Sequence, residues 1–188
     1  MQKLTTIKGN ALLLNFFGIF IGVILYLLVY KLAWDVQVPN ISLKHRLFII
    51  PIFTVVMIAF VYMHEGIHLL AAMIFIKSKQ VSIRWRWLVC ECRVHTYLSR
   101  NQFVVYGLAP AILMGILTVI AYYATASSVV KYFAAVLFIA SVASGGGDFW
   151  FIGRMLMLPK HVLVLDHGSE MEVFTTDGEL ISETERQA

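Results

Sequence analysis

The pentapeptide HEGIH at residues 64–68 most constrains what this chain can fold into. It lies in an apolar run from Leu47 to Ile76 whose only charged side chain is Glu65. On a helix, His64 and His68 occupy positions i and i+4 of one face, where both imidazoles can reach one zinc ion. Glu65 then lies beside that face and can take a proton from an attacking water. A polar cluster is costly in an apolar span, so we interpret the motif as functional rather than as two histidines packed in a bundle core.

The composition is that of a membrane protein. Hydrophobic residues make up 60% of the 188 residues and charged residues 14%, whereas a soluble domain carries about 25% charged residues. The mean hydropathy is +0.79. The chain is therefore short of the polar surface that a soluble domain of this size needs.

Four apolar segments are long enough to cross a bilayer. They run over about 11–34, 47–76, 103–124 and 129–158. The second and fourth exceed a straight crossing, so we expect tilt or a break. The predicted fold is an all-α membrane protein with about four transmembrane helices, in which residues 1–160 form a membrane-embedded metalloprotease-like domain and residues 161–188 a polar C-terminal tail.

Basic residues predict the orientation of the chain. They gather before the first segment, between the second and third, and at the end of the fourth: Lys3, Lys8, Lys77, Lys79, Arg84, Arg86, Arg93, Arg100, Arg154 and Lys160. The positive-inside rule places both termini and the middle loop in the cytoplasm. The net charge of +4 is small and scattered, so we expect a lipid bilayer and no nucleic acid as partner.

The fourth segment supplies one acidic residue, Asp148, in the stretch SGGGDFW. A catalytic zinc needs three protein ligands and an open position, which His64, His68 and Asp148 satisfy. At about 1.5 Å per helical residue, His68 and Asp148 lie at similar depths, about 12 and 15 Å from the cytoplasmic ends of their spans. The glycines at 145–147 permit close helix approach or local unwinding. The alternative for Asp148 is a helix cap or a core hydrogen bond.

An HExxH motif on one membrane helix, with an aspartate after a glycine-rich stretch on a later one, resembles the site-2 protease class of intramembrane zinc metalloproteases. It is more similar to a bacterial family of small integral-membrane proteins described as putative zincin peptidases. The resemblance covers roughly residues 47–158 and implies a multi-pass protein of the bacterial inner membrane, with Zn2+ held by His64, His68 and Asp148 and with Glu65 as catalytic base. The site-2 class typically has glycine after the aspartate, whereas Phe149 follows here.

The middle loop predicts a short β-hairpin-like cytoplasmic insertion, because apolar and basic residues alternate between Gln80 and Leu98. The insertion is either an interfacial belt of Trp and Arg side chains or an edge strand that holds an extended substrate. Cys90 and Cys92 are expected to be reduced there. A second metal site formed by these cysteines with His95 is the less favoured reading, because structural zinc sites usually have two separated ligand pairs.

The tail predicts a short strand at Val162, Val164 and Leu165, followed by a turn at 166–168. Three of its residues could compete for the metal, but we expect them at the surface because they lie beyond the fourth span: His161, Asp166 and His167.

The predicted function is an intramembrane zinc metalloprotease that hydrolyses peptide bonds of a membrane protein or peptide at a cytoplasm-facing site. The polar candidates to stabilise the oxyanion are Asn101, Tyr106 and Arg154. One alternative is a non-catalytic zinc-binding membrane scaffold, which would not need Glu65. Another is a small metal or proton transporter that uses Glu65 and Asp148, in which the HEGIH spacing has no special purpose.

Overall fold

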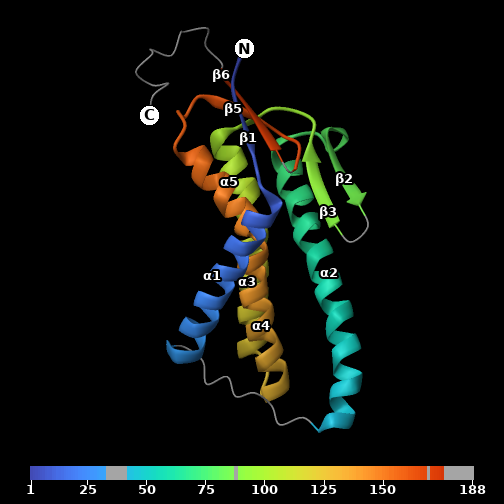
Figure 1. The fold of residues 1–188 in the computed structure, drawn as a ribbon. Coiled ribbons are helices and arrows are strands. Elements are labelled where there is room, and N and C mark those ends of the chain that lie inside the picture. The colour runs from blue at the N-terminus through green and yellow to red at the C-terminus, as the bar shows by residue number, and fades with distance from the viewer. Residues whose placement is uncertain (33–41, 87–88, 169, 176–188) are drawn as a thin grey trace.

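A computed structural model describes residues 1–32, 42–86, 89–168 and 170–175. The helices are α1 (Ala11–Leu32), α2 (Leu43–Phe75), α3 (Arg100–Tyr123), α4 (Ser128–Ser144) and α5 (Gly146–Leu156), with a short 3-10 helix at Ser78–Gln80. The strands are β1 (Gln2–Lys8), β2 (Val81–Arg86), β3 (Val89–Val94), β4 (Leu98–Ser99), β5 (Val162–Asp166) and β6 (Glu170–Thr175). Figure 1 shows the long helices side by side, with the strands gathered at one end of them.

Two helices are long and apolar enough to cross a membrane: α2 over Leu47–Phe75 and α3 over Arg100–Tyr123. Helices α4 and α5 pass the same test together but meet at a 42° bend, which gives a third, broken span. In α1 the qualifying apolar stretch, Phe16–Leu28, is shorter. The mostly helical fold is thus confirmed, the described residues contain two or three candidate membrane spans, and the fourth span stays a prediction.

The strands form two antiparallel sheets. The predicted hairpin is present as β2 paired with β3, from Val81 opposite Val94 to Arg86 opposite Val89. A four-stranded sheet of order β1-β6-β5-β4 was not predicted as such, because its strands come from distant parts of the sequence. The prediction of an all-α fold with only a hairpin insertion is therefore wrong, because the protein also contains a four-stranded sheet. The predicted tail strand and turn are correct, since β5 ends at Asp166 and turns into β6.

The inward face of the four-stranded sheet belongs to the main hydrophobic core. Val164 and Val173 are fully buried and pack in one cluster with Phe103 of α3 and Ile152 of α5. The division of the chain at residue 160 stays a prediction, although residues of β5 and β6 pack in the main core and β6 pairs with β1.

Helix α3 begins at a capping box that fixes its first turn. The Ser99 hydroxyl accepts a hydrogen bond from the Gln102 amide at 3.3 Å, and the Gln102 side chain accepts one from the Ser99 amide at 2.9 Å. These bonds satisfy donors that the helix start leaves free. Ser99 also belongs to β4, which pairs with β5, so the cap ties the start of α3 to the four-stranded sheet.

Both roles expected of the glycines before Asp148 are present. Gly145 ends α4 at the 42° bend. Gly146 then crosses α1 so closely that a β-carbon on it would lie 2.6 Å from the Cα of Gly18. This crossing fixes the first turn of α5, which carries Asp148.

We therefore predict that Gly146→Ala destabilises the protein by about 1–3 kcal/mol, because the added methyl group overpacks two backbones. The melting temperature of the purified protein measures the effect. Gly153→Ala in the same helix is the matched control, since a β-carbon there meets no atom within 4 Å. Equal melting temperatures for the two variants would refute the close crossing.

Candidate metal centre

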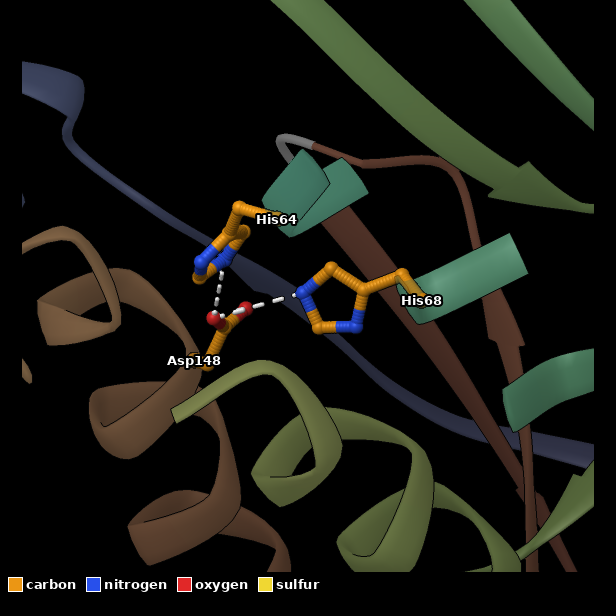
Figure 2. Close-up of side chains that lie close together, drawn as sticks. All are labelled: His64, His68 and Asp148. Carbon is orange, nitrogen blue, oxygen red and sulfur yellow. Dashed lines mark hydrogen bonds and ion pairs between the residues drawn. The ribbon is translucent and has the colours of Figure 1, made fainter. Parts of the chain in front are cut away.

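Three side chains meet where α2 passes the start of α5. His64 and His68 project from α2, and Asp148 from the first turn of α5. Asp148 Oδ2 lies 3.2 Å from His64 Nε2 and 3.4 Å from His68 Nε2, as Figure 2 shows. Potential ligand atoms of the three residues all lie within 4.8 Å of one another. The structure thus brings together the three residues that the sequence analysis selected as ligands.

The outer ring nitrogens fix the tautomers of both histidines. His68 Nδ1 lies 3.1 Å from the backbone oxygen of Tyr106, which can only accept, so this nitrogen carries the proton. Ser144 Oγ lies 3.4 Å from His64 Nδ1 and donates its own proton to the Ser141 carbonyl oxygen at 3.1 Å. Ser144 therefore accepts from His64 Nδ1. We infer that both Nε2 atoms keep their lone pairs.

This arrangement fits a divalent metal ion. Two Nε2 lone pairs and Asp148 Oδ2 face one another, and such acceptors repel unless a cation or a proton lies between them. Zinc bonds of about 2.1 Å that meet at a tetrahedral angle place their ligand atoms about 3.4 Å apart. The observed separations from Oδ2, 3.2 and 3.4 Å, match that spacing. Two imidazoles and one carboxylate are a donor set that catalytic zinc sites use.

The candidate ligands line, or lie against, a cavity of about 680 Å³. His64 and His68 are 6% and 4% exposed, whereas the Asp148 side chain is 26% exposed. His68 and Asp148 line the cavity together with Glu65. The site is thus sheltered from bulk solvent but has room for a substrate group next to the ligands.

Glu65 is placed apart from the three candidate ligands. Its Oε2 accepts a hydrogen bond from the backbone N–H of Cys92 on β3 at 2.9 Å. Glu65 is not among the residues whose atoms converge for a metal, yet it lines the same cavity as His68 and Asp148. This placement suits a base next to a metal better than a ligand.

The three residues considered for oxyanion stabilisation differ in burial and in distance from the site. Tyr106 is buried, lines the cavity and packs its ring 4.7 Å, centroid to centroid, from that of His68. Asn101 and Arg154 are exposed, and Arg154 stacks on Trp150. Of the three residues considered for oxyanion stabilisation, only Tyr106 reaches the site.

The structure does not support the second metal site considered for the middle loop. Cys92 is buried against the site, whereas His95 is exposed and its Nε2 interacts with Ser82 Oγ at 2.7 Å. Among the described residues, neither belongs to a group of potential metal ligands. The Cys90 side chain lies outside the described part.

Residues 57–163 match the family described as "Putative zincin peptidase". The match spans more than half of the chain and includes His64, Glu65, His68 and Asp148. The chain belongs to this family. No curated protein and no solved structure matches the chain. Membership of the zincin peptidase family, as expected from the motif, is confirmed and indicates a metallopeptidase; similarity to the site-2 class stays a prediction.

One residue of this zincin-family protein was misplaced by the sequence analysis. Asp166 was expected at the surface but is 6% exposed and lines the cavity beside His68. Burial raises the pKa of Asp166 to about 6, because the ionised carboxylate loses hydration. The surface prediction holds for His161, which is exposed, and the His167 side chain is 40% exposed. Among the described residues, neither histidine belongs to the candidate ligand group.

We predict that Asp148→Asn lowers zinc affinity at least about tenfold without preventing membrane insertion, because Asn keeps the size but not the charge that offsets the metal. Zinc content after dialysis against a chelator measures the effect. His161→Ala and His167→Ala are the controls and should bind zinc as the wild type does. If Asp148→Asn binds zinc normally and either histidine variant loses zinc, the third ligand has to be assigned to the tail instead of Asp148.

A second prediction concerns pH. The folded-state pKa of Asp166, about 6, lies above the unfolded value, so the folded metal-free protein loses stability as this carboxylate ionises. The penalty is small below about pH 4, is complete above about pH 7, and amounts to about 3 kcal/mol. Asp166→Asn should therefore stabilise the metal-free protein at pH 7.5 and not at pH 4, as measured by thermal unfolding. A gain that is the same at both pH values would show that ionisation of Asp166 is not the cause.

Proposed function

We propose that this protein is a zinc-dependent metallopeptidase that hydrolyses peptide bonds of membrane-associated substrates at a cytoplasm-facing site. The observation that carries the proposal is the convergence of His64, His68 and Asp148 beside a cavity that His68, Asp148 and Glu65 line. Family membership supports the same chemistry.

The proposed chemistry divides the work among the residues of the site. His64, His68 and Asp148 would hold zinc, which when bound polarises a carbonyl and acidifies water. Glu65 takes one proton from the water that attacks the scissile carbonyl carbon. As the C–N bond breaks, the same carboxyl group returns the proton to the leaving amine. Tyr106 lies on the cavity wall next to His68.

The cavity supports a substrate that comes from the bilayer. It extends along α2 to Met57, about two helical turns before His64, and reaches Ile19 of α1. Helix α2 diverges from the other helices toward its N-terminal end in Figure 1, and only 11% of its most apolar window is buried. A lipid-embedded segment can thus approach between α1 and α2.

Strand β3 supports an extended substrate conformation. The Cys92 N–H points to Glu65 and therefore away from β2, because N–H groups alternate in direction along a strand. The β3 edge opposite β2 accordingly faces the base. A peptide added along this edge would lie beside Glu65, with main-chain hydrogen bonds holding it extended for hydrolysis.

The proposed orientation follows from the paired ends of the chain. Strands β1 and β6 are hydrogen-bonded neighbours, so residues 2–8 and 170–175 lie on one side of the membrane. A chain with both ends on one side crosses an even number of times. Helices α2 and α3 are candidate spans, and the α4–α5 pair is a third if it forms one broken span; an even number of crossings then requires α1 as the fourth. The positive charge near these ends supports assigning their shared side to the cytoplasmic face of a bacterial inner membrane.

The proposal predicts that Glu65→Gln keeps about one zinc per chain and loses at least about a hundredfold in hydrolysis, as expected for removal of a general base. Cleavage of a membrane-peptide library by the full chain in lipid nanodiscs, together with zinc analysis, measures both. Gly66→Ala is the matched control within the same motif, because a β-carbon there meets no atom within 4 Å. Full activity of Glu65→Gln would exclude the mechanism, and lost zinc would make Glu65 a ligand. If the wild type binds zinc but cleaves no peptide, the result would support the alternative of a non-catalytic zinc-binding scaffold.

A further inference from the structure

Asp166 occupies a position where strand geometry calls for an apolar side chain. Successive residues of a strand point to opposite faces, and β5 follows this rule, with Val162, Val164 and Asp166 all buried. A buried carboxylate is costly unless it is hydrogen-bonded. A turn alone does not require the burial, because an exposed aspartate makes the same turn. The placement therefore indicates a role inside the cavity.

Two groups hold the Asp166 carboxylate. The Gly168 N–H donates to Oδ1 at 2.8 Å, and the carboxylate interacts with the Tyr106 hydroxyl, which also interacts with Cys92. Gly168 has a φ of +88°, a backbone conformation that suits glycine, and a β-carbon on it would lie 3.3 Å from Glu91 Oε2. The turn between β5 and β6 is thus shaped and packed so that Asp166 faces Tyr106.

Tyr106 in turn contacts a candidate metal ligand twice. Its carbonyl oxygen accepts the His68 Nδ1 proton at 3.1 Å, and its ring packs against the His68 ring at 4.7 Å. A hydrogen bond to the outer nitrogen of a metal-binding histidine sets the tautomer and the ring orientation. Any shift of Tyr106 therefore alters the direction of the His68 Nε2 lone pair.

We propose that Asp166 is a positioning residue, which anchors Tyr106 and through it holds His68 in the orientation that binds the metal. The inference rests on the proposed function, because it assumes that His68 binds zinc. Asp166 lies beyond the segment that matches the family, residues 57–163. On this proposal the four-stranded sheet, in which β6 pairs with both β1 and β5, supports the metal site through Asp166.

The test measures zinc affinity of the full chain in lipid nanodiscs by competition with a chelator. Asp166→Ala and Tyr106→Phe each remove one side of the same hydrogen bond and should each weaken zinc binding about tenfold, as loss of an outer partner does. The double variant should bind zinc with the same affinity as the single variant that binds it less tightly, because both changes break the same interaction between Asp166 and Tyr106. Asp166→Asn keeps an acceptor for the Tyr106 hydroxyl and should restore most of the affinity.

A spectroscopic readout separates positioning from general destabilisation. The visible absorption of Co2+ bound in place of zinc reports ligand geometry, and it should change in Asp166→Ala and Tyr106→Phe. Glu172→Gln is the control on the same hairpin: it breaks an ion pair with Lys3 at the exposed side of the sheet and should leave affinity and spectrum unchanged.

Three results would overturn the inference: wild-type zinc affinity in Tyr106→Phe, effects of the two single variants that add in the double variant, or an unchanged Co2+ spectrum. Tyr106→Phe removes only a hydroxyl group, so it decides the matter even where Asp166→Ala does not fold. A wild type that binds zinc without cleaving peptides leaves this test intact and refutes only peptidase activity. A wild type that binds no zinc refutes both.

Discussion

The structure depends on the meeting of three hydrogen-bond acceptors among apolar helices. The partners of the outer nitrogens favour protonation of both histidines at Nδ1, so that Nε2 of His64, Nε2 of His68 and Asp148 Oδ2 face one another as acceptors. Such a cluster repels itself unless a cation neutralises it. The helices have to hold it in place before the metal arrives, and the glycine crossing of α5 on α1 provides this rigidity at Asp148.

The parts of the site that sequence predicts are those with a local pattern. HEGIH places His64 and His68 one turn apart on a helix, and a single acidic residue in the last apolar segment selected Asp148. Both deductions need only helix geometry and the cost of charge in a bilayer. The alternation of residues in the middle loop likewise predicted β2 and β3. The family match agrees with the motif over residues 57–163.

What the sequence did not predict depends on contacts between distant segments. The pairing of β1 with β6 joins residues 2–8 to residues 170–175, and no local pattern specifies such a partner. Asp166 was expected at the surface because it lies beyond the fourth span, although Val162 and Val164 on the same face of β5 indicate burial. Tyr106 was one of three equal candidates until the fold showed that Asn101 and Arg154 are exposed.

A mostly helical membrane protein with buried carboxylates needs strands because strand edges and turns have backbone N–H groups that are free to donate hydrogen bonds. Within a helix, the backbone N–H groups are bonded to the carbonyl groups one turn away, so an apolar helix offers a buried carboxylate almost nothing. Strand edges and turns do have N–H groups to spare. Cys92 on β3 gives its N–H to Glu65, and Gly168 in the turn after β5 gives its N–H to Asp166. The helices thus supply the acceptors that suit a metal, while the two sheets supply the donors that hold the acidic groups around it. Because the donors come from both sheets, the hairpin and the terminal strands have to pack against the same end of the helices for the site to form.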